Sequence, residues 1–164
     1  MSKKIALQKS LIREMREFIA GAIMNNQRVA DRLEINTTDH QVLNLVDLLE
    51  ERAKPGELAR LTGLTTGGVT VSLDRLERAG YVKRERNPRD RRSVIVRMVP
   101  EQQKKIHALY KMINEAMARI FEPYDEKELA TVLDFFVRTN RARADAAAGS
   151  LPADSLEKPR PPAL

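Results

Sequence analysis

The sequence predicts a mainly α-helical fold with one small β-hairpin. Two observations lead to this prediction. Apolar residues recur at the 3.6-residue spacing of amphipathic helices over most of the chain. Residues 81–86 and 93–99 instead alternate or run β-branched on either side of a turn-forming sequence, Asn87, Pro88, Arg89 and Asp90. The chain has no run of 18 or more apolar residues, so we expect no membrane span.

Length and composition indicate a single globular domain. The chain has 164 residues, which is enough for a real hydrophobic core. It contains no cysteine, so it has neither a disulfide framework nor a thiol that could sense oxidants. The N-terminus has two lysines but no apolar segment followed by a cleavage site, and we therefore expect a cytoplasmic protein.

Residues 1–34 are predicted to form an N-terminal helix. Its two faces differ, because charged residues such as Arg13 and Glu14 lie opposite a wide apolar face. Two interpretations of that face remain open: an ordinary core contact, and a helix shared between a partner subunit and the neighbouring module. The apolar face consists of Leu11, Ile12, Met15, Phe18, Ile19, Ala22 and Ile23.

The next predicted helix follows Asn36, whose side chain can cap it. Asp39, at the third helical position, favours the positive end of the helix dipole. Most of the remaining positions are apolar, so we expect a mostly buried helix. These apolar residues are Val42, Leu43, Leu45, Val46, Leu48 and Leu49.

A helix, a tight turn and a second helix are predicted between Pro55 and Gly80. Pro55 suits a first helical position and Gly63 supplies a C-terminal stop. Thr65 can cap the second helix, and Val69, Leu73 and Leu76 form its buried stripe. The outer face of the second helix is then formed by Thr66, Gly67, Thr70, Val71, Asp74, Arg75 and Arg78.

The hairpin carries most of the excess positive charge. Seven basic residues and two acidic residues lie between Lys83 and Arg97, a local net charge of +5, while the whole chain is only +6. This clustering, beside a helix that exposes hydroxyls, methyls and arginines, favours nucleic-acid binding over a solubilising charge run. Gly67 and Gly68 lower helix propensity, so we expect close backbone approach to another molecule there, or simple tolerance near a helix start.

Two further helices and a tail complete the chain. A helix that opens at Pro100 and Glu101 is predicted to end before Pro123, and Asp125 with Glu128 forms a capping-box-like start for the last helix. From Ala146 the chain is rich in small residues and proline, so residues 146–164 are predicted to be a disordered tail. A docking peptide is the alternative for the tail.

The segment TTGGVTVSLDRLERAGYVKRERNPRDRRSVIV resembles the signature of MarR-family regulators, which have a winged helix-turn-helix. The resemblance covers residues 35–100 by motif and the flanking helices by pattern. It implies a mainly α fold with a small β-wing, in which a winged helix-turn-helix domain at 35–100 is flanked by dimerisation helices at 1–34 and 101–145.

The resemblance also implies how DNA would be contacted. A homodimer would place recognition helix 65–79 of each subunit in the major groove of double-stranded DNA, and wing 81–99 beside it. Arg92 would enter the minor groove, oriented by Asp90, while Arg89 and Arg91 would meet phosphates. The predicted DNA-binding residues are Thr65, Thr66, Gly67, Gly68, Thr70, Val71, Arg75, Arg78, Arg84, Arg86, Arg89, Asp90, Arg91 and Arg92.

Two departures from the family pattern concern the edges of the module. Lys54 stands where the family commonly has a capping hydroxyl, and it either contacts a phosphate or is simply exposed. Met98, Val99 and Pro100 replace the usual Leu-Thr and Gly pair after the second strand, which affects the joint to the next helix and not DNA contact.

A small aromatic or phenolic effector is a further implication of the resemblance. Met15, Ile19 and His40 are the predicted ligand-binding residues in a cleft between the dimer helices and the winged module. Three roles remain open for His40: a core or boundary histidine, a polar anchor in the ligand pocket, or a metal ligand. The metal role is disfavoured, because the chain has one other histidine and no cysteine.

Taken together, these observations predict a sequence-specific transcriptional regulator, a ligand-responsive repressor that binds a pseudopalindromic operator as a homodimer. Catalytic motifs are absent from the sequence, and we expect neither an enzyme nor a cofactor. Two alternatives remain: a non-specific architectural DNA-binding protein and a winged-helix protein-interaction module. A neutral or apolar wing would have favoured the latter.

Overall fold

The structure of the protein is a computed structural model that describes residues 2–88 and 90–147. Arg89 and residues 148–164, most of the predicted tail, lie outside the described residues. The chain divides into two compact units, Met1–Ile106 and His107–Leu164.

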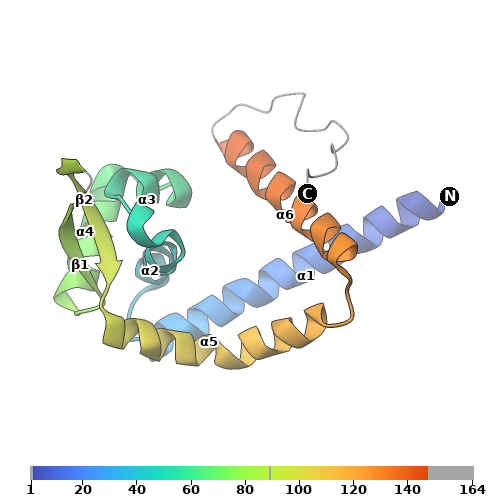
Figure 1. The fold of residues 1–164 in the computed structure, drawn as a ribbon, viewed down its shortest axis with the longest axis horizontal. Coiled ribbons are helices and arrows are strands. Elements are labelled where there is room, and N and C mark those ends of the chain that lie inside the picture. The colour runs from blue at the N-terminus through green and yellow to red at the C-terminus, as the bar shows by residue number, and fades with distance from the viewer. Residues whose placement is uncertain (1, 89, 148–164) are drawn as a thin grey trace. The chain divides into compact units, whose positions relative to one another are not determined.

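Helices dominate both units (Figure 1). The first unit holds α1, α2, η1, α3, α4 and the strands β1 and β2, while α5 begins there and ends in the second unit with α6. The predicted fold class, mainly α with a small β-wing, is confirmed. The bounds are α1 Lys3–Arg32, α2 Thr37–Leu49, η1 Glu50–Arg52, α3 Pro55–Thr62, α4 Thr66–Arg78, β1 Val82–Asn87, β2 Asp90–Met98, α5 Pro100–Phe121 and α6 Glu126–Ala147.

Local chemistry sets the helix boundaries in the first unit. The Asn36 side chain accepts a hydrogen bond from the Asp39 backbone N–H at 2.8 Å and so caps α2. Gly63 ends α3 with a φ of 74°, a left-handed conformation that favours glycine. Thr65 then caps α4, since its Oγ1 accepts from the Gly68 N–H at 3.1 Å. These caps confirm the predicted helix-turn-helix.

The two strands form an antiparallel hairpin, which we call the wing. Val82 pairs with Met98 and Arg86 with Val94, and a register shift follows between Arg86 and Asn87. The Val96 N–H also donates to the Ala53 carbonyl at 2.7 Å, so β2 is attached to the segment between η1 and α3.

The core of the first unit lies between the helix-turn-helix and the wing. The predicted α4 stripe is fully enclosed, and side chains from α2, α3 and both strands complete it. Burying each such Leu, Ile or Val contributes about 1.5–3 kcal/mol, so this cluster fixes where α4 lies. Its largest apolar members are Val42, Leu43, Val46, Leu58, Val69, Leu73, Leu76, Val82, Ile95 and Val96.

The predicted apolar face of α1 is largely exposed in the single chain. Only Val29 and Ala30, near its C-terminus, are buried, whereas Phe18 and Ile23 are both 63% exposed. The expectation that α2 is mostly buried holds for its inner face, but Leu48 is exposed.

In the second unit, α6 begins with a reciprocal capping box. The Asp125 N–H donates to Glu128 Oε2 at 3.0 Å, and the Glu128 N–H donates to Asp125 Oδ1 at 2.8 Å, as predicted. Several large apolar side chains of α6 are exposed, among them Leu133, Phe136 and Val137. Within the part of the chain that the structure describes, every helix is too short or too polar to cross a membrane.

Candidate nucleic-acid interface

The N-terminal half of α4 presents small, uncharged side chains to solvent. Thr66, Gly67 and Thr70 are exposed, and Val71 is 52% exposed. The Thr70 hydroxyl donates to the Thr66 carbonyl at 2.9 Å, so its oxygen is left to accept a hydrogen bond from outside. Gly68 is half-buried and its N–H is used by the Thr65 cap. This surface therefore exposes methyl groups, the Thr70 hydroxyl oxygen as a hydrogen-bond acceptor, and the backbone at Gly67.

The C-terminal half of α4 carries charge, but one of its arginines has a partner inside the chain. Arg75 Nε and Nη2 donate to the two carboxylate oxygens of Asp39, at 2.7 and 2.6 Å. Asp39 is only 2% exposed and also accepts from the Ser72 hydroxyl at 2.6 Å. Burial opposes ionisation of Asp39, but the bonds from Arg75 and Ser72 outweigh it and lower its pKa. Arg75 and Arg78 are both exposed to solvent.

Arg84 ties the wing to α4. Its Nη2 donates to Asp74 Oδ1 at 2.7 Å, and its Nη1 forms a short ion pair with Glu77. The Arg84 backbone N–H also donates to Glu77 Oε1 at 3.0 Å. Partial burial opposes the charge of Arg84, yet the two carboxylates outweigh it and raise its pKa. Arg84, predicted to bind DNA, is thus engaged within the protein.

The tip of the wing is organised by Asp90. Its carboxylate accepts from the Arg92 backbone N–H at 3.1 Å, and its carbonyl accepts from the Ser93 hydroxyl at 3.0 Å. Asp90 therefore orients the backbone of Arg92. The side chains of Arg86 and Arg92 are exposed. The predicted phosphate contact Arg89 lies outside the described residues, and so does the side chain of Arg91.

Two other basic residues of the wing share one carboxylate. Lys83 Nζ lies 2.7 Å from Glu85 Oε1, and Arg97 Nε lies 3.0 Å from Glu85 Oε2. The hydrogen bond from Lys83 lowers the pKa of Glu85, and the positive charges of both partners add to this shift. Their positive charge is therefore partly neutralised within the wing.

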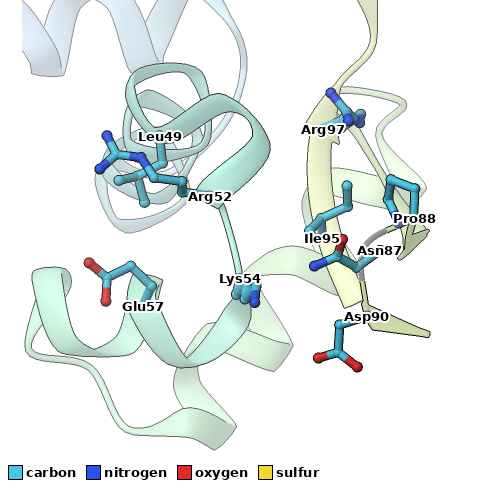
Figure 2. A pocket seen from close by; sticks show the side chains of 9 residues that line it. All are labelled: Leu49, Arg52, Lys54, Glu57, Asn87, Pro88, Asp90, Ile95 and Arg97. Atoms are coloured by element: carbon cyan, nitrogen blue, oxygen red, sulfur yellow. The ribbon is translucent and has the colours of Figure 1, made fainter. Parts of the chain in front are cut away.

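A groove of about 450 Å³ separates the wing from η1 and the start of α3 (Figure 2). Figure 2 shows Arg52, Lys54 and Glu57 on one wall and Asn87, Asp90 and Arg97 on the other. Lys54 is exposed and makes no side-chain cap for α3. The groove is lined by side chains of both signs of charge, among them Arg52, Lys54 and Glu57.

The three predicted ligand-binding residues lie on two helices, with His40 on α2 and with Met15 and Ile19 about one turn apart on α1. His40 is fully buried in α2, and its burial lowers its pKa. Met15 is half-buried and Ile19 is exposed, both on α1. Met15 lies 14 residues before Val29, the buried part of α1, a distance of about 21 Å along a helix. None of the three lines the groove of Figure 2. Among the described residues, no group of three or more His, Cys, Asp or Glu could hold a metal ion.

Sequence reasoning missed the network around Asp39. The local sequence predicts only that Asp39 lies in the first turn of a helix, and it assigns no role to Ser72. Asp39 lies 36 residues before Arg75, and nothing in their local sequence links them. A charged residue within an otherwise apolar helix face was the only available signal, since buried carboxylates are rare unless they are paired.

Comparisons with known proteins identify a family and related sequences. Residues 33–93 match the sequence model of the MarR family. The chain is 35% identical over 131 residues to the uncharacterized HTH-type transcriptional regulator YcgE of Bacillus subtilis (strain 168), and the match covers 79% of this chain and 83% of that protein.

Solved structures share the fold. The MarR family transcription regulator SP03579 superposes with a TM-score of 0.60 at 18% identity, covering 90% of this chain and 97% of that one. Wild-type MarR of E. coli in its apo form gives a TM-score of 0.51 at 22% identity, covering 79% and 94%. At these identities the solved structures establish the fold alone.

Proposed function

Because the chain belongs to the MarR family of transcriptional regulators, we propose that it binds a pseudopalindromic operator as a homodimer and represses transcription until an effector binds. Regulators of this family bind DNA and are not enzymes. The observation that carries the proposal is the exposed, uncharged N-terminal half of α4 beside a wing with exposed arginines.

In the proposed complex, α4 enters the major groove and reads base edges. The methyl groups of Thr66, Thr70 and Val71 suit contact with thymine methyls. Because the Thr70 hydroxyl donates within the helix, its oxygen suits an amino donor of adenine or cytosine. Gly67 lets the backbone come close to the groove floor. Thr65 contributes as the cap that fixes the start of the helix.

The wing supplies the contact with the flanking minor groove. Arg92 is exposed and follows the Asp90 turn, which supports its insertion into a narrow A·T-rich groove of enhanced negative potential. Arg78 and Arg86 are exposed and suit phosphate contacts. Arg89 and Arg91 remain proposed phosphate partners from the family resemblance.

The dimer is supported by apolar surface that the single chain leaves uncovered. Leu11, Phe18 and Ile23 of α1 are exposed, and so are Leu133 and Phe136 of α6. A second copy could bury these faces in an isologous interface with twofold symmetry. Two recognition helices would then reach half-sites about 10 bp apart, or a multiple of that spacing.

The proposed effector is a small aromatic or phenolic compound that binds between the dimer helices and the winged module. Met15 and Ile19 are accessible on α1 and remain candidate contacts. His40 is enclosed by its own module, so it would meet an effector only after local opening. Because the related regulator YcgE is bacterial, and a bacterial chromosome lies in the cytoplasm, we propose that this protein acts in the cytoplasm.

The test is a fluorescence-anisotropy titration of the protein with DNA from upstream of its own gene, with scrambled DNA of equal length alongside. At about 150 mM salt we expect a preference of about a thousandfold or more for the native fragment. If both fragments bind equally well, the titration is repeated with fragments selected from the whole genome. Equal binding there too would indicate a non-specific architectural protein instead.

Arg92→Ala tests the minor-groove contact in the same assay. We expect operator affinity to fall by about 1–3 kcal/mol with the fold intact. Arg119→Ala is the matched control, because it removes one exposed positive charge from α5, outside the winged module. If both variants bind the operator equally well, the assignment of Arg92 is wrong.

A further inference from the structure

Asp39 stands out among the charged residues because it is buried and bonded to the recognition helix. It lies in the first turn of α2, is 2% exposed, and accepts from Ser72 and Arg75, which are three residues apart on α4. Asn36 Nδ2 donates to the same carboxylate at 2.8 Å. One carboxylate on α2 therefore holds two successive turns of α4.

The geometry of this contact differs from that of the core beneath it. Burial of Val69, Leu73 and Leu76 attracts α4 to the module, but the hydrophobic effect is non-directional. The guanidinium of Arg75 meets Asp39 through two parallel bonds, at 2.7 and 2.6 Å. Such a forked pair specifies an orientation as well as an attraction. The pair can therefore restrict rotation of α4 about its own axis.

The wing is bonded to α4 in a similar way, through a second arginine. Arg84 of β1 bonds to Asp74 and Glu77 of α4. The exposed row from Thr66 to Val71 is thus fixed by one arginine–carboxylate contact to α2 and a second to the wing. A change in either contact would alter how that row meets the bases.

We propose that Asp39 is a positioning residue that sets the orientation of the recognition helix, and that Arg75 serves DNA binding through this pair and not as a reader of bases. The inference rests on the proposed function, since it concerns how that function gains sequence preference. Two of the five N–H groups of Arg75 are used by Asp39. The pair thus determines where the remaining donors of Arg75 lie.

The electrostatic effect and the positioning role predict opposite changes in operator affinity for Asp39→Asn. The change removes a negative charge close to the DNA-binding surface, which by charge alone strengthens binding to every DNA sequence. Loss of the forked pair instead misplaces the base-contacting row. We expect operator affinity to fall about tenfold, comparable to one mismatched base pair, while affinity for scrambled DNA stays the same or rises.

The experiment measures operator and scrambled-DNA affinities for wild type, Asp39→Asn, Arg75→Lys and the double variant. Arg75→Lys keeps the charge but loses the fork, so a phosphate contact would survive it and the positioning role would not. We expect each single variant to lower the ratio of operator to scrambled affinity, and the double variant to lower it no further. Glu14→Gln on α1 is the matched control for the charge change.

Thermal denaturation of each variant fixes a titration temperature at which all are folded. If Asp39→Asn does not fold, Arg75→Lys and Ser72→Ala carry the test. A wild-type protein that prefers its operator, with variants that prefer it equally, overturns the positioning role alone. A wild type without preference overturns the proposed function together with this inference. A loss in Arg75→Lys without a loss in Asp39→Asn would assign Arg75 a direct contact.

Discussion

Replacement of Gly67 by alanine separates the two interpretations of the paired glycines in the recognition helix. Gly67 occupies the second position of α4 and is exposed. A Cβ added there would meet nothing nearer than Thr65 Oγ1 at 4.0 Å, which is ordinary van der Waals contact. The folded protein can thus accept alanine without strain. Because glycine lowers helix stability relative to alanine, we expect Gly67→Ala to gain about 0.5 kcal/mol in the free energy of unfolding.

Operator affinity should move in the opposite direction. If the backbone at Gly67 approaches the floor of the major groove, the added methyl group pushes the helix outwards and weakens the neighbouring base contacts. A loss comparable to one mismatch, about 1–3 kcal/mol, is expected. Urea denaturation measures the first quantity and anisotropy with the operator measures the second.

The matched control is Gly56→Ala. Gly56 is the second residue of α3, and a Cβ there would meet nothing within 4 Å. It should stabilise the fold by a similar amount and leave operator affinity unchanged. Unchanged affinity for Gly67→Ala would refute the close-approach interpretation, and the glycine would then be tolerated only because it lies near a helix start.

Three further predictions concern the core, the buried carboxylate and the lysine that precedes α3. Leu76→Ala, at a fully buried position, should cost about 2–5 kcal/mol in the free energy of unfolding, measured by urea denaturation. The pKa of Asp39 is lowered in the folded protein, so the ionised carboxylate contributes to the free energy of unfolding. This contribution is fully present above the unfolded-state pKa of about 3.9 and is lost as the pH falls through the folded-state pKa. The difference in unfolding free energy between wild type and Asp39→Asn should therefore be constant above about pH 5 and shrink below about pH 4; a constant difference at all pH values would exclude the ion pair. Lys54→Ala should weaken binding to all DNA sequences alike and reduce the log–log salt slope by about 1, and an unchanged slope would leave Lys54 simply exposed.

The elements that were predictable from the sequence are those with local causes. Thr65 caps α4 through an N–H three residues away, and the Asp125–Glu128 capping box is equally local. The buried stripe of α4 followed from helical periodicity alone. By contrast, Arg84 reaches Asp74 over ten residues and through a change of secondary structure. Side-chain partners of that kind depend on how strands and helices pack, and periodicity and capping patterns report only on neighbours along the chain.

The number of positive charges on the wing overstates how many of them can meet phosphates. The sequence count gives seven basic residues on the hairpin, each a candidate for phosphate contact. In the structure, Lys83 and Arg97 share Glu85, and Arg84 bonds to Asp74 and Glu77. These three positive charges are already partly neutralised, so they would release few counterions on binding DNA. With a slope of about 0.9 for each phosphate neutralised, the wing would contribute about 6 to the log–log salt slope of one subunit if all seven basic residues met phosphates, and about 4 if the three paired residues met none. Part of the positive charge of the wing is therefore engaged within the protein, whereas the side chains of Arg86 and Arg92 are exposed.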